Sequence, residues 1–426
     1  MDRDSLNHPD RLIDDRGKHY PRHHMDHVKI VTKLPHPADL KLLKELNKYE
    51  AHSMQGQIPV VWNGAKDFMV YDRHGNEFID FTSGICVTNV GHGNEEVMKA
   101  IENQVIGYSP LAHAYTFGTQ IRLDFIKELV DTCYPNGKAF LVSAGTEATE
   151  VACKLMRIYS KKKVIISISG AMHGRTMLAE QLKGDNTWAD FTNKVWHLPV
   201  PTDQDTFIED MLVDYRNVAG FIIESYQGWS ATFYPKKWIQ DLIKFAKKNN
   251  IPVCFDEIQG GFGRTGKMFA YEHYDIERPD LICFGKGVSS SVPLSGVIGR
   301  TEIIDSVPVG SMSSTHSANP ISCAAGLANI RYIKKHRLVD RARLLGIGMI
   351  HHLSNLNIKV EGHGLLCAIH TNDAQTADEI VMECFKKGLL VIRTHRESVK
   401  IAPPLTISEK ALNEGLNIIS QVIKER

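Results

Sequence analysis

The middle of the chain alternates short apolar runs with longer amphipathic stretches, and this alternation limits its fold more than any other feature. Apolar runs at 138–142, 164–169 and 218–224 predict strands, whereas residues 146–159 and 235–248 carry apolar side chains at the spacing of a helix. Strands and helices that alternate along a chain form a doubly wound sheet, mainly parallel, with helices on both faces. The sequence therefore predicts an α/β fold.

Two further apolar runs each end next to a side chain that can take part in chemistry. Ile251–Phe255 is followed by Asp256, and Leu281–Phe284 is followed by Gly285 and Lys286. Ligands of such sheets bind beyond the carboxyl ends of the strands, so neighbouring strands would deliver this carboxylate and this amine to one site. The pair suits a bound aldehyde cofactor, because a lysine can form a Schiff base with an aldehyde and a carboxylate can keep a pyridine nitrogen protonated.

The residues around this pair resemble a known family. Residues 256–266 (Asp-Glu-Ile-Gln-Gly-Gly-Phe-Gly-Arg-Thr-Gly), followed by Pro279-Asp280 and Gly285-Lys286-Gly287, resemble the signature of class III pyridoxal-phosphate (PLP) aminotransferases, which include the acetylornithine, ornithine and 4-aminobutyrate aminotransferases. The likeness runs from about Asp67 to the C-terminus in the same motif order. It implies a PLP-dependent transferase of fold type I, in which a large domain with the doubly wound sheet is joined to a smaller α+β C-terminal domain.

The pattern of predicted elements agrees with this division. After about residue 330 it changes to a long helix, a strand pair around 360–370, a helix through Cys384, a strand near 389–394 and a final helix from Ser408. We therefore expect an N-terminal arm with the start of the small domain in residues 1–66, a large PLP-binding domain in 67–330 and the small C-terminal domain in 331–426.

The resemblance implies a role for each residue that matches a family motif. Lys286 would hold PLP as a Schiff base and shuttle a proton, and Asp256 would stabilise the pyridinium by a charge-assisted bond. Gln259 would lie near the ring hydroxyl of the cofactor. The other cofactor-binding positions are Ala144, Gly145, Thr146, Met172, His173, Ile258 and Thr315.

Several of these positions also have a plainer interpretation. Residues 143–146 lie between a predicted strand and helix, where backbone N–H groups favour a phosphate, but Ser143 or Thr146 could simply cap the helix. Ala144 stands where the family usually has Ser, so backbone donors must carry more of the binding. Met172 replaces the aromatic residue that stacks on the pyridine ring, which a thioether can still cover, with Ile258 on the other face. Both could instead be core residues.

Thr315, in the segment Thr315-His-Ser-Ala-Asn-Pro320, matches a threonine that reaches the phosphate of the neighbouring subunit in relatives. The resemblance therefore implies a homodimer whose active sites are built across its interface. Ser314 and Thr315 could otherwise be ordinary turn residues.

The substrate-binding positions depart from the family pattern. Glu224 matches a glutamate that gates a carboxylate-binding Arg, but Lys400 stands at the position of that Arg. Arg offers a planar fork to a carboxylate and Lys only a point charge, so this position does not predict the usual binding of glutamate and 2-oxoglutarate. Arg393 or Arg396 could compensate, or the substrate could carry its amine away from any carboxylate, as in a polyamine, an ω-amino acid or an amino sugar. Alternatively, Lys400 merely pairs with Glu224.

The expected activity is a ping-pong transamination between an amine or amino-acid donor and a keto or aldehyde acceptor. A PLP-dependent aminomutase, racemase or decarboxylase would keep the same cofactor residues, and so would a catalytically silent relative. A nucleotide hydrolase is a weaker alternative: residues 261–267 have the spacing of a phosphate-binding loop, but Met268 stands where a Ser or Thr would bind magnesium.

The composition excludes several other classes of protein. The formal net charge of +1 gives no sign of a nucleic-acid or membrane-surface partner, and no apolar stretch is long enough to predict a membrane span. Eight scattered cysteines without a C-x-x-C motif predict buried thiols, and with no signal sequence we expect a cytoplasmic protein. His19, His23 and His27 have helical spacing, but Pro21 interrupts it. A solvated or dimer-wrapping arm is therefore favoured over a metal site.

Overall fold

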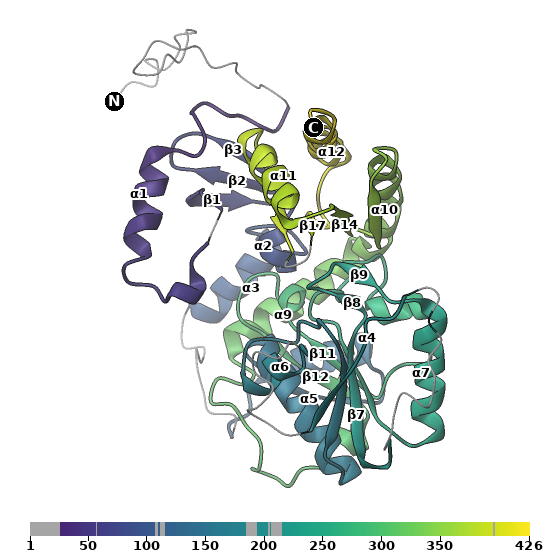
Figure 1. Cartoon of the computed structure of the whole chain (residues 1–426). Coiled ribbons are helices and arrows are strands. Elements are labelled where there is room, and N and C mark those ends of the chain that lie inside the picture. The colour runs from purple at the N-terminus through teal and green to yellow at the C-terminus, as the bar shows by residue number, and fades with distance from the viewer. Residues whose placement is uncertain are drawn as a thin grey trace, which may run out of the picture.

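A sheet of seven strands forms the centre of the larger body of the protein (Figure 1). The computed structural model describes residues 26–56, 58–106, 110, 116–184, 194–202, 205, 215–394 and 397–426. All neighbouring strand pairs in the sheet are parallel except the two that involve β12. The order across the sheet is β4 (Lys138–Val142), β12 (Ser295–Gly299), β11 (Leu281–Phe284), β10 (Val253–Asp256), β7 (Val218–Glu224), β5 (Val164–Ile168) and β6 (Val195–Leu198).

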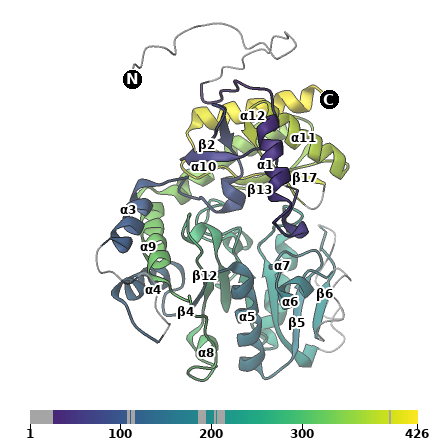
Figure 2. The same ribbon diagram turned by 90° about the vertical axis from the view of Figure 1, so that its left-hand side faces the viewer.

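Helices cover both faces of this sheet, as Figure 2 shows from the side. Every residue of β7 is buried; Ala219 and Ile222 face one apolar core, and Phe221 and Ile223 face the other. One core includes α5 (Gly145–Ser160), α6 (Met177–Gln181) and α8 (Thr301–Ile304), and the other includes α4 (Gln120–Cys133), α7 (Lys236–Lys248) and α9 (Pro320–Lys335). The predicted mainly parallel, doubly wound sheet is confirmed.

The smaller body holds two four-stranded sheets. The first has the order β1 (Trp62–Lys66), β2 (Met69–Asp72), β3 (Glu77–Asp80) and β15 (Leu389–Leu390), and the second has the order β13 (Lys359–His363), β14 (Leu366–His370), β17 (Ser398–Ile401) and β16 (Ile392–Arg393). In the first, Ile79 of β3 pairs with Leu389 of β15 in parallel. This pairing joins residues 77–80 to the C-terminal part, whereas the sequence analysis assigned residues from 67 onwards to the large domain. That division stays a prediction.

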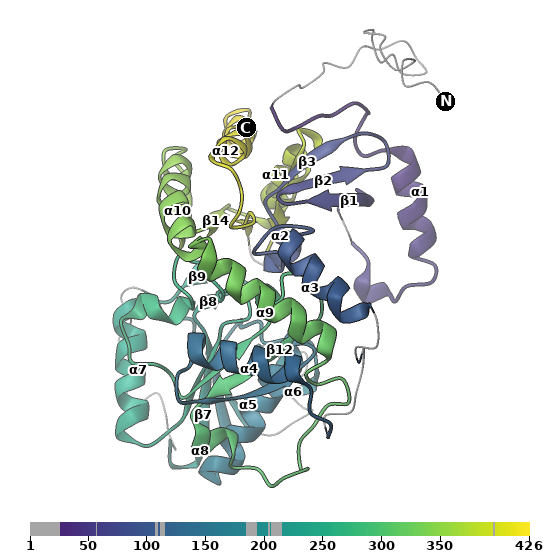
Figure 3. The same cartoon turned by 180° about the vertical axis from the view of Figure 1, so that it is seen from behind.

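The long helix expected after about residue 330 is confirmed as α10 (Leu338–Ser354). It is separated from α9 at Arg337, whose φ of 49° is left-handed and cannot continue a right-handed helix. Figure 3 shows α9 running beside α3 (Glu95–Val105) across the back of the molecule. The other helices predicted beyond residue 370 are confirmed as α11 (Ala374–Lys386) and α12 (Glu409–Lys424).

Short helices, a strand pair and 3₁₀ turns are the other regular elements of the described chain. The remaining helices and strands are α1 (Pro37–Leu46), α2 (Ser83–Cys86), the pair β8 (Tyr226–Gln227) and β9 (Thr232–Phe233), and the 3₁₀ turns at His52–Met54, Tyr215–Asn217, Ala270–Tyr274 and Lys286–Val288. All eight cysteines are buried and free, as the sequence predicted. In the part of the chain that the structure describes, no helix is long and apolar enough to cross a membrane.

Candidate active site

Strands β10 and β11 bring Asp256 and Lys286 to the same edge of the sheet. The two strands pair in parallel, with Asp256 opposite Cys283, and Lys286 follows the end of β11 by two residues. Asp256 is 5 % exposed. The prediction that neighbouring strands deliver the carboxylate and the amine to one place is therefore confirmed.

A histidine fixes the carboxylate of Asp256. Nδ1 of His173 lies 2.7 Å from Asp256 Oδ2, and the N–H of Ile258 donates to Oδ1 at 3.0 Å. Burial alone would lower the pKa of His173, but the hydrogen bond and the negative charge of Asp256 outweigh burial and raise it. Each carboxylate oxygen keeps a lone pair for one further donor, so the group can also bind a protonated ring nitrogen.

Lys286 presents a free amine in a strained part of the backbone. Its φ of 44° is left-handed, and its Nζ has no hydrogen-bond or ion-pair partner among the described residues. Burial lowers the pKa of this amine, while the negative charges of Asp256 and Glu224 act in the opposite direction. A lowered pKa increases the share of neutral, nucleophilic amine, as Schiff-base chemistry requires.

Two asparagines that the sequence analysis did not single out hold the turn at Lys286. Asn329 Nδ2 donates to the carbonyl oxygens of Gly287 and Val288, at 2.8 Å each. A Cβ at Gly287 would lie 2.4 Å from Asn89 Nδ2, so only glycine allows this contact. Neither asparagine belongs to a recognisable local motif, because both act from segments distant in the sequence.

Arg264 lies within the quoted family signature and is fully buried. Its guanidinium donates to Asn89 Oδ1 at 2.8 Å and to Ser83 Oγ at 3.2 Å, and also to the carbonyl oxygens of Leu365 and Pro403. All four partners are neutral oxygens. The segment with the spacing of a phosphate-binding loop therefore forms turns around this arginine, and no α-helix begins at its end, so the nucleotide-hydrolase alternative is not supported.

The start of α5, where the sequence predicts a phosphate-binding turn, has both engaged and free backbone donors. The N–H groups of Ser143 and Ala144 both donate to Glu147 Oε2 at 2.9 Å, whereas those of Gly145 and Thr146 have no partner among the described residues. Thr146 Oγ1 accepts from the N–H groups of Arg175 and Thr176. The Thr146 hydroxyl therefore faces this neighbouring loop, and the free backbone donors remain for a phosphate.

Ile258 lies against the start of α5, and Met172 lies beside Glu224. A Cβ at Gly145 would come 2.9 Å from Ile258 Cδ1, so glycine allows the helix end to approach the isoleucine closely. The N–H of Met172 donates to Glu224 Oε2 at 2.8 Å. Both hydrophobic side chains are half-buried, unlike the fully buried core strands beside them, which is consistent with their predicted contact with a ligand.

Glu224 and Lys400 do not pair directly. Glu224 uses its other oxygen to accept from the N–H of Gly228 at 2.9 Å, and burial raises the pKa of this carboxyl. Lys400 Nζ donates to the Gly228 carbonyl at 2.8 Å and to Gln259 Oε1 at 2.9 Å. The alternative of a simple Lys400–Glu224 ion pair is therefore wrong: Gly228 lies between the two side chains and bonds both.

The structure brings other predicted residues to different places. Arg393 Nε pairs with Asp378 Oδ1 at 2.6 Å, and both line a cavity of about 740 Å³ together with Ile85, Trp62 and Ile392. Thr315 is exposed, and Arg396 lies outside the described residues, as do His19 and His23. No cluster of three or more possible metal ligands occurs among the residues that the structure describes.

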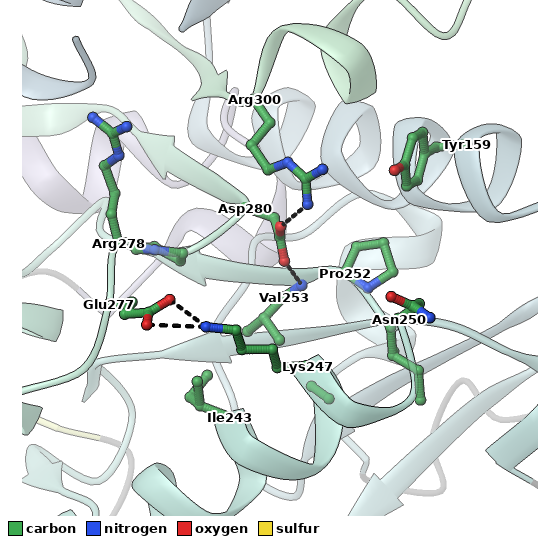
Figure 4. Close-up of a pocket in the computed structure, with 13 residues that line it drawn as sticks. Tyr159, Ile243, Lys247, Asn250, Pro252, Val253, Glu277, Arg278, Asp280 and Arg300 are labelled. Carbon is green, nitrogen blue, oxygen red and sulfur yellow. Dashed lines mark hydrogen bonds and ion pairs between the residues drawn. The ribbon is translucent and has the colours of Figure 1, made fainter. Parts of the chain in front are cut away.

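A second cavity lies at the opposite edge of the sheet. It has a volume of about 340 Å³ and is lined where β10 and β11 begin, by residues that include Val253, Asp280 and Arg300 (Figure 4). Four of its charged side chains pair with one another: Lys247 with Glu277 at 2.8 Å, and Arg300 with Asp280 at 2.7 Å. It is therefore separate from the site at Lys286.

These groups fit pyridoxal phosphate. The free N–H groups at Gly145 and Thr146 suit a phosphate, the remaining lone pairs of Asp256 suit a pyridinium, and the unpaired amine of Lys286 suits an aldehyde. Arg175 is a further cation that the sequence analysis left without a role. Its side chain is 58 % exposed, and its guanidinium lies 5.3 Å above the ring of Trp229.

Comparison with known proteins shows the family of the whole chain. A profile of the family "Aminotransferase class-III" matches residues 51–423. The chain is 28% identical to the 4-aminobutyrate aminotransferase of Mycobacterium leprae, covering 93% of this chain and 98% of that protein, and 31% identical to the 2-aminoadipate transaminase of Pseudomonas putida, covering 86% and 96%. The crystal structure of the acetylornithine aminotransferase from Elizabethkingia anophelis superimposes with a TM-score of 0.79 at 26% identity, covering 93% of this chain and 100% of that chain. The chain therefore belongs to the class III aminotransferases, enzymes that transfer amino groups with pyridoxal phosphate.

Proposed function

We propose that this transaminase takes its amino group from an ω-amino acid, whose amine lies far from its carboxylate, and that Arg175 binds that carboxylate. The observation that carries the proposal is the engagement of Lys400 and Glu224 by neighbours within the chain. The side chain of Arg175 is 58 % exposed, its Nη1 lies 3.5 Å from Glu180 Oε1, and its backbone N–H donates to Thr146 Oγ1 at the start of α5. Relatives named as 4-aminobutyrate and 5-aminovalerate aminotransferases act on substrates of this kind, which supports the choice.

Each residue of the site would have its own role in amino transfer. When bound, pyridoxal phosphate supplies an aldehyde for the amine and an electron sink for the carbon beside it. Lys286 would hold the cofactor through Nζ and would also carry the proton that moves during amino transfer. Asp256, held by His173, keeps the ring nitrogen protonated. Gly145 and Thr146 anchor the phosphate, and Met172 and Ile258 exclude water from the ring faces.

The test is a panel of donors followed by the change in cofactor absorbance on amino transfer. ω-Amino acids should react faster than α-amino dicarboxylates. Arg175→Met should raise KM for ω-amino acids roughly tenfold, the value of one lost charge-assisted hydrogen bond, and leave amines without a carboxylate unchanged. Arg337→Met is the matched control, because Arg337 is an exposed arginine that pairs with Asp340 on α10. Equal loss for amines with and without a carboxylate would contradict the role of Arg175.

The substrate roles predicted for Glu224, Lys400 and Arg393 stay predictions that the same panel tests. Lys400→Arg should favour glutamate or 2-oxoglutarate if residue 400 faces the substrate, because Arg can make two parallel bonds to a carboxylate. The pairing of Arg393 with Asp378 favours a structural role for Arg393.

The enzyme is further proposed to act as a cytoplasmic homodimer with shared sites. Support comes from exposed apolar side chains along α3 and α4, namely Met98, Val105 and Leu123, and from the exposed position of Thr315. Light scattering would give the mass. Subunits with Lys286→Ala and subunits with Thr315→Asp should each be inactive or weak alone, and mixing them should restore activity. Absence of recovery on mixing would mean that Thr315 serves its own chain or no site.

A further inference from the structure

Lys400 is a buried amine whose hydrogen-bond partners are neutral oxygens. It is 5 % exposed, and its Nζ lies 2.8 Å from Gly228 O, 2.9 Å from Gln259 Oε1 and 5.4 Å from the centre of the Tyr226 ring. No carboxylate of the described residues lies within ion-pair distance of this amine. Burial removes most of the water around this ammonium group, and two hydrogen bonds and a ring contact replace only part of that hydration. The contacts of Lys400 therefore do not explain its buried position by stability alone.

These contacts determine which way the amide of Gln259 points. An ammonium group has donors and no acceptor, so only the oxygen of the amide can face Lys400. The amide nitrogen of Gln259 must then point away from the Lys400 ammonium group. It packs directly on Gly228, where a Cβ would come within 1.9 Å of Nε2, and it has no hydrogen-bond acceptor among the described residues.

Gln259 stands three residues after Asp256, on the loop that follows β10, so its free amide N–H groups belong to the same edge of the sheet as the cofactor site. We infer that Lys400 is a positioning residue for the cofactor: it orients the Gln259 amide so that the N–H groups face an oxygen of the cofactor ring, and it does not bind the substrate's carboxylate. This inference rests on the proposed role of Gln259 beside the cofactor.

The protonation state of Lys400 is compatible with this role. Burial, together with the positive charge of Lys286, lowers its pKa to about 8, although Cys86 and Glu224 act in the opposite direction. At pH 7 the amine therefore remains mostly protonated and keeps its donors. Gly228 is equally necessary, because any side chain there would displace the amide that Lys400 holds.

The test is a double-mutant cycle read by the pH midpoint of the cofactor's visible absorbance change in the holoenzyme. An amide N–H on a ring oxygen and a nearby positive charge both favour loss of the proton that this change reports. Lys400→Met should therefore move the midpoint upward by about one pH unit, the scale of one hydrogen bond. In a Gln259→Leu background the same substitution should move it by less than half as much. A shift of half or more in that background would overturn the inference.

Kinetics give an independent readout. If Lys400 instead binds the substrate's carboxylate, Lys400→Met raises KM for donors with a carboxylate and leaves the midpoint unchanged, which overturns the inference. Lys387→Met is the control, since Lys387 is a partly buried lysine that pairs with Glu425 and should leave both quantities unchanged. Should Lys400→Met not fold, Lys400→Gln enters the same cycle. A wild-type protein without cofactor absorbance would refute the proposed residue roles, whereas equal shifts in both backgrounds refute only the role of Lys400.

Discussion

Asp256 and His173 form a buried pair in which the histidine ring binds one of the two carboxylate oxygens. Asp256→Asn would keep the size of the side chain but remove its negative charge. Losing one partner of a buried charge pair costs roughly 3–5 kcal/mol, so proton transfer should slow by about 10²- to 10⁴-fold. Single-turnover absorbance with a fixed donor measures this step separately from cofactor binding. Near wild-type rates would mean that the carboxylate only supports the structure.

The buried amine of Lys400 should also make the stability of the protein depend on pH. Its folded pKa of about 8 lies below the ordinary value of 10.5, so between these two pH values the unfolded chain binds more protons than the folded one. The contribution of Lys400 to stability is therefore fully present above pH 10.5 and is lost as the pH falls through 8.

Lys400→Met should remove this pH dependence. Across the window the wild type should gain roughly 3 kcal/mol of unfolding free energy relative to the variant. Urea unfolding of both proteins at several pH values from 7.5 upward, each with saturating cofactor, measures the difference. If the unfolding free energies of the two proteins changed in parallel with pH, the amine would not be buried in its charged form.

At the scale of single elements, helix α10 contains two glycines in opposite surroundings. A Cβ at buried Gly346 would lie 2.1 Å from the carbonyl oxygen of Gly364 in the turn before β14, whereas a Cβ at exposed Gly348 would meet nothing within 4 Å. Gly346→Ala should destabilise the protein by roughly 1–3 kcal/mol through overpacking against backbone. Gly348→Ala should stabilise it by about 0.5–1 kcal/mol, because alanine favours the helix. Thermal unfolding compares the two, and a lower Tm for Gly348→Ala would contradict the argument.

The sequence predicted those elements whose pattern is local. The period of apolar residues and the turn signals predicted β4, α5, β7, α7, β10 and β11, and the charged residues at or just beyond the ends of β10 and β11 indicated the site. It did not predict the pairing of β3 with β15, which joins residues more than 300 positions apart, or the antiparallel β12 within the parallel sheet. It did not predict the partners of Lys400 and Arg264 either, because they come from segments far from these residues in the sequence.

At the scale of the whole molecule, Arg264 joins parts of the chain that are distant in sequence. Its guanidinium contacts Ser83 and Asn89 on one side and Leu365 and Pro403 on the other, and Asn89 in turn packs on Gly287 beside Lys286. Arg264→Met leaves these oxygens without donors, so we expect a loss of roughly 3–5 kcal/mol of unfolding free energy.

Arg264→Lys keeps the charge but supplies fewer donors, and it should fall between Arg264→Met and the wild type. Cofactor affinity, measured by fluorescence titration of the apoprotein, should decrease in the same order, because the turn at Lys286 loses its support through Asn89. A variant that lost stability while binding the cofactor with wild-type affinity would show that the two are not linked.

The parallel pairing of β3 with β15 has a consequence for synthesis of the protein. Residues 77–80 emerge from the ribosome more than 300 residues before their strand partner at 389–390. Until then β3 remains an open strand edge, a template for pairing with other chains. When translation is fast, the temperature is high or chaperones are limiting, part of the protein should therefore aggregate before its chain is complete. Slower translation should increase the yield of active enzyme.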